Sequence, residues 1–211
     1  MTNSSHNIDN DLIIRGMSKL RDFACKNLEI RGMTSAVRGV VAQSATIRGA
    51  TQLESVTIQH NLCVRGMTHL EAVTIHGDVC VRGMTNIEKG SIQGDVCIHG
   101  MIKIEQSTIQ GSMRVAGKVF LENSKVHAIQ VISSSGCYSK IGSIERSSTG
   151  SITIEMSGIK SWLSWCGCVR PRIQLEDSVV DGDITFVGCK GIVILEGSSR
   201  ITGHVIGGII K

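Results

Sequence analysis

The sequence predicts an all-β fold, a single-stranded parallel β-helix solenoid, and two observations lead to this prediction. The first is a repeat, because short apolar segments return every 17 residues, most of them followed by a basic residue and a glycine. The second is composition, because 41% of the 211 residues are hydrophobic but only 3% are aromatic. Stacked coils with inward columns of Ile, Val, Leu and Met would form such a core without large aromatic residues.

The repeat covers seven blocks and keeps several columns in phase. The blocks read LIIRGMSKL, LEIRGMTSA, ATIRGATQL, LCVRGMTHL, VCVRGMTNI, VCIHGMIKI and MRVAGKVFL, and they begin at Leu12, Leu28, Ala45, Leu62, Val79, Val96 and Met113. A second column contains glutamate, at Glu54, Glu71, Glu88, Glu105 and Glu122. An internal repeat with a short fixed period is the sequence signature of a solenoid.

Each block predicts about three short strands joined by corners. In the block that begins at Val79, apolar and polar residues alternate up to Arg82, which is typical of a strand with one buried face. Gly83 allows a corner, after which we expect Met84 and Ile87 to point inward. Seventeen residues are too few for a pair of helices, and the chain length predicts about ten or eleven coils.

The chain divides into a polar tail at residues 1–11, regular coils at 12–128 and a less regular continuation of the β-helix at 129–211. Within the continuation, residues 161–172 contain both tryptophans and the single proline, and we expect them to protrude as a loop. The tail lacks the basic and apolar regions of a signal peptide, and no apolar run reaches the length of a membrane span. We therefore expect a cytoplasmic protein.

Several phrases built around Gly-Asp resemble those of the bactofilins, which are polymer-forming cytoskeletal proteins of bacteria. The phrases are IHGDVCVRG, IQGDVCIHG, IQGSMRVAG and VDGDITFVG, beginning at Ile75, Ile92, Ile109 and Val180. The resemblance implies a right-handed β-helix and a protein that forms polymers. Association with a membrane is left open.

The ends of a β-helix expose unpaired strand edges and an open core unless other residues cap them. Apolar residues near the two ends are therefore our candidates for self-association: Leu12, Ile14, Val205, Ile206, Ile209 and Ile210. We expect a non-enzymatic scaffold that associates end to end, as a homopolymer or an end-on dimer. The sequence contains no Ser-His-Asp, Cys-His or phosphate-loop pattern, and we expect no cofactor.

The alternative is an adaptor or a bacterial effector that does not polymerise and binds a protein partner through its side. The candidate residues for partner binding are Arg31, Arg48, Arg65, Arg82, Trp162 and Trp165. The arginine column, which begins at Arg15, suits a polyanion, or it covers the coil while the glutamate column offsets its charge. We favour the second interpretation, and the scarcity of aromatic residues predicts no nucleic-acid binding.

Cysteines form a further column. Cys63, Cys80 and Cys97 lie between inward residues, so we expect an outward row of thiols. A row does not give the tetrahedral arrangement that zinc prefers, and small surface residues are the favoured interpretation. The lone Cys166-Gly167-Cys168 segment is a weak zinc signature, so we predict no metal site.

Overall fold

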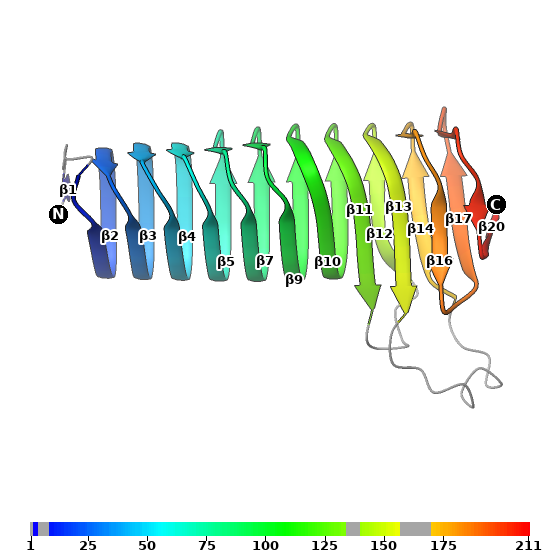
Figure 1. Ribbon diagram of the computed structural model, residues 1–211, viewed down its shortest axis with the longest axis horizontal. Coiled ribbons are helices and arrows are strands. Elements are labelled where there is room, and N and C mark those ends of the chain that lie inside the picture. The colour runs from blue at the N-terminus through cyan, green and yellow to red at the C-terminus, as the bar shows by residue number, and fades with distance from the viewer. Residues whose placement is uncertain (1, 4–8, 134–139, 157–169) are drawn as a thin grey trace.

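The computed structural model describes residues 2–3, 9–133, 140–156 and 170–211. Every regular element in these ranges is a β-strand, and the strands form one sheet that winds into a β-solenoid of about ten turns. Figure 1 shows a rod with β1 at one end and β20 at the other. The predicted fold class is confirmed, and the right-handed sense of the coil stays a prediction.

The described residues form strands of very different length, because some run through a corner and others end at one. In chain order they are β1 (Thr2–Asn3), β2 (Leu12–Cys25), β3 (Leu28–Val41), β4 (Ala45–Ile58), β5 (Leu62–Glu71), β6 (Thr74–Ile75), β7 (Val79–Glu88), β8 (Ser91–Ile92), β9 (Val96–Glu105), β10 (Thr108–Glu122), β11 (Lys125–Ser133), β12 (Lys140–Glu145), β13 (Ser148–Met156), β14 (Arg172–Glu176), β15 (Val179–Val180), β16 (Ile184–Val187), β17 (Gly191–Glu196), β18 (Arg200–Ile201), β19 (Val205–Ile206) and β20 (Gly208–Ile210).

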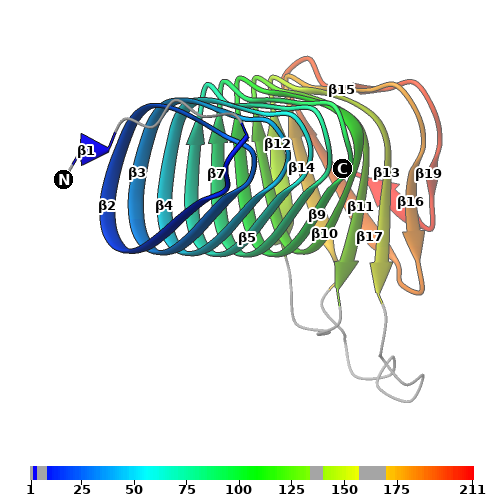
Figure 2. The ribbon, with the colours of Figure 1, turned by 60° about the vertical axis from the view of Figure 1, so that its left-hand side comes forward.

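Successive coils pair in parallel, in the register that the repeat predicts. Leu28 pairs with Ala45 and Ala45 with Leu62, a step of one repeat each time. The first step is one residue shorter, since Leu12 pairs with Leu28. Figure 2 shows the consequence, a stack of similar coils whose strands lie side by side along the rod.

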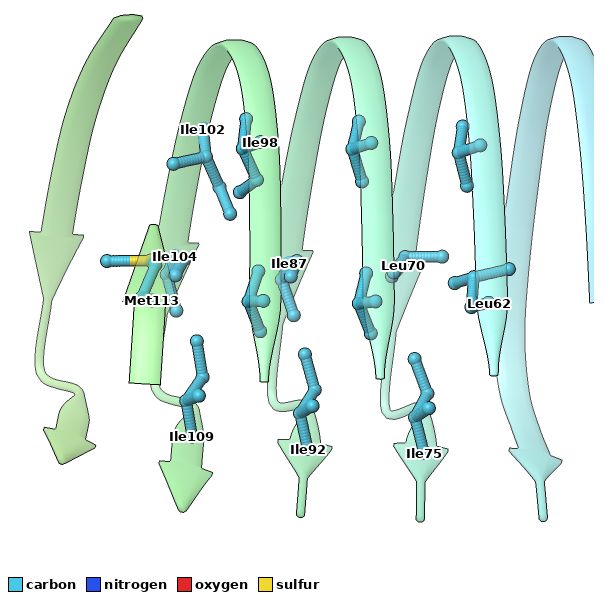
Figure 3. Close-up of a cluster of buried hydrophobic side chains, with 14 of the residues drawn as sticks. Leu62, Leu70, Ile75, Ile87, Ile92, Ile98, Ile102, Ile104, Ile109 and Met113 are labelled. Carbon is cyan, nitrogen blue, oxygen red and sulfur yellow. The ribbon is translucent and has the colours of Figure 1, made fainter. Parts of the chain in front are cut away.

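The interior of the rod is a continuous stack of aliphatic side chains (Figure 3). Ile58, Ile75 and Ile92 occupy one inward column, and each is at most 1% exposed. Burying one such side chain contributes about 1.5–3 kcal/mol, so the stack of columns supplies the main stabilising term. This confirms the prediction of a core that needs few aromatic residues.

Most of the described methionines lie outside this core, although we expected methionine to point inward. Met84 is 51% exposed, whereas Thr85 and Ile87 face inward. The alternation of β7 continues without a break through the corner at Gly83, so Met84 stays on the outward side. Among the described methionines, Met113 alone is fully buried.

Two of the corners depend on left-handed backbone conformations. Gly83 has a φ of +138°, and a Cβ atom on it would overlap the carbonyl oxygen of Gly66 in the preceding coil. Only glycine fits such a position. The next corner uses residues with side chains, such as Ala72 and Lys89, at φ values of 52° and 54°, and the sequence analysis did not identify it.

The third corner contains the Gly-Asp phrases. The side-chain oxygen Oδ1 of Asp78 accepts a hydrogen bond from the backbone N–H of Asp95 in the next coil, at 2.9 Å. Asp95 repeats the contact with the N–H of Ser112 at 2.7 Å. These aspartates therefore join neighbouring coils, and the phrases that resemble the bactofilins serve the stacking of the solenoid.

A ladder of buried serines continues the solenoid into its less regular half. The backbone N–H of Ser124 donates to Oγ of Ser147 at 3.0 Å, and that of Ser147 donates to Oγ of Ser178 at 3.1 Å. These steps span 23 and 31 residues, so the register is kept although extra residues are inserted between the coils. The predicted continuation of the β-helix beyond residue 128 is present in the described residues.

The predicted loop at 161–172 lies mostly outside the described residues. Trp162 and Trp165 are among the residues that the structure does not describe. Arg172, at the end of the predicted range, already belongs to β14 and pairs with Ile192 of β17.

Candidate functional site

The candidate residues for self-association lie at the ends of the rod, and among the described residues the strands of the last coil are paired on one side only. Strands β18, β19 and β20 each pair with a single described strand. Ile206, Ile209 and Ile210 are 50%, 46% and 53% exposed, whereas most aliphatic side chains within the rod are buried. Val205 is half-buried and ends an inward column. The last coil therefore offers both unpaired strand edges and apolar surface.

The N-terminal end is more covered than predicted. β1 pairs with Lys19 and Leu20 of β2, and Leu20 is only 3% exposed. Ile14 is also buried, so it belongs to the chain's own core, while Leu12 is half-buried. Ile13, which the sequence analysis did not single out, is 56% exposed on β2.

The two ends of the rod fit one another in register. Following the pairings coil by coil, Ile210 of β20 stands in the column that contains Ser18. β1 begins in the column of Lys19, which is the next position along the coil. Lys211 forms backbone hydrogen bonds with Val193 and Leu195, so it stands opposite Ile194 and in the column of Lys19. The arc that ends at Lys211 and the arc that β1 begins therefore meet in one column.

The predicted arginine column forms an exposed ladder, which we call the arginine ladder. It consists of Arg15, Arg31, Arg48, Arg65 and Arg82. Arg31 forms an ion pair with Glu29 at 2.6 Å. Within the described part of the chain, no carboxylate lies within ion-pairing distance of the other four.

Among the described residues, the glutamate column forms no ion pair with the arginine ladder. Glu88 lies 3.3 Å from Lys89, Glu105 pairs with Lys103, and Glu122 pairs with Arg146. The glutamates stand six residues further along each strand, which is about 20 Å of extended chain. Four of the five arginines of the ladder therefore have no carboxylate partner in the described part of the chain, and Arg31 pairs with Glu29.

A groove that the sequence analysis missed runs beside this ladder. Its rim is a column of exposed methionines, and we call it the methionine groove. The column reads Met17, Met33, Ala50, Met67, Met84 and Met101. The groove has a volume of about 930 Å³. The alternation of the strand could have revealed it, because residues two positions apart point to the same face. Each methionine stands two residues after a residue of the outward basic column, so it must also point outward.

Threonines that line the groove carry hydroxyl groups without partners. Thr34, Thr51, Thr68 and Thr85 are 4–6% exposed, and none of their Oγ1 atoms has a hydrogen-bond partner in the described structure. Buried polar groups are normally hydrogen-bonded, so a row of exceptions at one site marks an unusual local environment. On the far side of the groove stand polar and basic side chains such as Lys19, and none of the described residues that line it is acidic.

The cysteine column points outward, as predicted. Cys63 pairs in register with Cys80 and Cys80 with Cys97, and all three are free thiols that are exposed or half-buried. Partial burial, with the neighbouring Cys80, raises the pKa of Cys63. Among the described residues, no group of three or more His, Cys, Asp or Glu side chains is arranged to hold a metal ion.

These observations define the class of the protein as a β-solenoid, and its described residues include a lateral face with an apolar groove beside a basic ladder. Comparisons of the chain with protein-family models, curated proteins and solved structures gave no match. In the described ranges, no helix has the length and hydrophobicity that a membrane span requires.

Proposed function

We propose that this chain is a non-enzymatic scaffold of the cytoplasm that associates end to end, in the manner of the bactofilins. The observation that carries the proposal is the match between the arcs of β20 and β1. In a head-to-tail contact, the C-terminal coil of one copy leads into the N-terminal coil of the next, and the two arcs overlap only in the column that contains Lys211 and Thr2. The coil spacing of about 4.8 Å would then run unbroken across the junction.

Such a junction places apolar residues on apolar residues. The column of Val205 leads back to Leu12, and the column of Ile206 leads back to Ile13. One coil step across the junction would bring Val205 against Leu12 and Ile206 against Ile13 of the next copy. Removing the two exposed isoleucines from water stabilises the contact by the hydrophobic effect.

The geometry of the contact favours a polymer. It joins two different surfaces, so each added copy offers a new open end, and such a heterologous contact forms filaments when it does not close into a ring. Unpaired parallel strand edges are natural templates for further pairing. The Gly-Asp phrases stabilise the stacking of coils within one copy. The support for a cytoskeletal role comes instead from the apolar residues and strand edges at the ends of the rod.

The test is sedimentation velocity over a series of protein concentrations, on the parent and on Ile206→Lys, Ile13→Asp and the double variant. Each single substitution places a charge against an isoleucine at the junction, so we expect each to lower the assembled fraction at least tenfold. The double variant places the introduced carboxylate directly against the introduced ammonium group, so it should recover assembly. Val40→Asp on β3 is the control, because Val40 is 41% exposed and pairs with both neighbouring coils.

The series also distinguishes the possible contacts. Recovery in the double variant supports the head-to-tail register. Loss of assembly in Ile206→Lys without recovery in the double variant would assign a contact between two C-terminal ends and overturn this junction. A parent protein that stays monomeric at every concentration would overturn the scaffold proposal itself.

A further inference from the structure

The methionine groove and the arginine ladder form one continuous face along the first five coils, and the groove extends to Met101 on the sixth. On β2, β3, β5 and β7 the outward residues follow in the order arginine, methionine and a polar residue, as in Arg65, Met67 and His69. β4 has Ala50 in the methionine position and β9 has His99 in the arginine position. Met67 is 57% exposed and Met84 is 51% exposed. The face therefore has an apolar strip with a cationic border on one side, in which four of the five arginines have no ion-pair partner among the described residues.

An apolar strip of this size is unusual on a protein surface that faces only water. Five thioether side chains share one column over five coil steps, which corresponds to about 24 Å along the rod. Methionine side chains are flexible and polarisable, and they are over-represented on surfaces that adapt to a bound partner. Ala50 interrupts the column, which leaves room between Met33 and Met67 for one large side chain of a ligand.

We infer that the methionine groove binds an amphipathic α-helix of a partner protein, which carries Asp and Glu on the flank that faces the arginine ladder. The helix would lie along the rod and press its apolar stripe between the methionines and the polar column. This inference does not depend on end-to-end association, because the face lies on the side of the rod.

The dimensions of the groove suit a helix. A length of about 24 Å corresponds to about 16 helical residues at 1.5 Å each. Apolar residues at positions i, i+3 or i+4, and i+7 recur about every 5.4 Å, which is close to the coil spacing of about 4.8 Å. Each turn of the helix would thus meet approximately one coil, and apolar anchors at this spacing are the usual mode of binding a helix in a groove.

The positive charge of this face favours a partner helix with acidic residues. The residues that line the groove include Lys19, His69 and Lys103 but no carboxylate, and four arginines of the ladder have no described ion-pair partner. Two copies of this chain packed groove to groove would bring no opposite charges together. An acidic helix would neutralise the ladder, and complementary charge across an interface raises the association rate and the specificity.

The test is a display selection with a library of 16-residue helices that have a fixed leucine stripe and randomised polar positions. Immobilised baits are the parent protein, Met67→Glu/Met84→Glu, Arg65→Glu/Arg82→Glu and the control Val40→Glu. Thermal melting verifies that each bait is folded. We expect the parent and the control to enrich helices with Asp or Glu along one flank. The methionine variant should bind the enriched peptides at least tenfold more weakly, and the arginine variant should lose the preference for acidic residues.

Three outcomes would overturn the inference. The first is a selection on the parent that enriches no acidic amphipathic sequence over the input library. The second is enrichment that is equal on the parent and on the methionine variant. The third is failure of the selection together with methionine-dependent binding to vesicles of phosphatidylcholine and phosphatidylserine, which would assign the face to a membrane surface.

Discussion

The backbone of Gly66 lies directly on that of Gly49, so a Cβ atom on Gly66 would overlap the carbonyl oxygen of Gly49. Gly66 also has a φ of +135°. Gly66→Ala should therefore destabilise the rod by about 3 kcal/mol or more, because it combines a backbone clash with a strained conformation. The measurement is the free energy of unfolding in urea.

Gly16 provides the matched control for this prediction. It belongs to the same column and has a φ of +90°, but no atom lies within 4 Å of a Cβ atom built on it. Gly16→Ala should cost only about 1 kcal/mol, from backbone strain alone. Equal losses of stability for the two variants would contradict the close stacking of the glycines.

Replacement of a groove threonine by valine should stabilise the protein. Thr68 is 5% exposed and its hydroxyl has no partner among the described residues, so the hydroxyl is buried without compensation. Valine has the same shape and no polar group, and we expect Thr68→Val to raise the free energy of unfolding by about 1 kcal/mol. A loss of stability of similar size would show that the hydroxyl has a partner in solution.

Removal of a hydroxyl from the serine ladder should have the opposite effect. Oγ of Ser124 accepts from the N–H of Ser107 at 3.1 Å and donates to the carbonyl oxygen of Glu122 at 2.8 Å. Ser124→Ala leaves these buried groups unpaired, which should cost about 1–3 kcal/mol. Chemical denaturation measures the change, and an unchanged midpoint would count against a continuous ladder.

The stability of the rod should fall at alkaline pH because of one buried thiol. Burial, with a smaller effect of Asp11, raises the pKa of Cys25 to about 11 from an ordinary value of 9.0. The protonated thiol therefore favours the folded state fully below pH 9, and this contribution is lost as the pH rises to 11. The expected loss is about 2–3 kcal/mol.

Urea denaturation at pH 8.5 and pH 11 measures this loss, with Cys25→Ala as the control. The variant lacks the titrating group, so its stability should fall less over the same interval. A fall of equal size in the parent and the variant would assign the effect to other groups.

Much of the fold follows from the repeat. Columns spaced by 17 residues predicted the register of Arg31, Arg48 and Arg65, because stacking forces equivalent residues into one column. The alternation predicted the inward position of Ile87. The outward row of cysteines followed from the same alternation.

The sequence analysis missed the methionine groove because it placed the methionines by their hydrophobicity and not by their position in the alternation of the strand. Met84 is apolar, so we expected it inside, yet it stands an even number of residues from the outward Cys80. Inward and outward residues keep alternating in the same phase on both sides of the corner at Gly83. The inward position next to Met84 belongs to Thr85, a polar residue, which hid the pattern.

The path of the less regular half had a signal that the sequence analysis did not use. Each serine of the ladder stands two residues after a glutamate, in the segments Glu105–Ser107, Glu122–Ser124, Glu145–Ser147 and Glu176–Ser178. Oγ of each serine bonds the carbonyl oxygen of that glutamate. The recurring Glu-x-Ser is a signal for this register, although the same spacing also occurs at Glu155–Ser157 and Glu196–Ser198. The fit between the two ends of the rod depends on the summed length of all insertions, so short segments of sequence do not reveal it.

The most direct test of end-to-end association is electron microscopy of the purified protein over a range of protein and salt concentrations. A head-to-tail junction predicts filaments with a subunit repeat of about 50 Å, from about ten turns, and an unbroken coil spacing of about 4.8 Å. Ile206→Lys should abolish the filaments, and Ile13→Asp/Ile206→Lys should restore them. Single short rods under every condition would contradict the account.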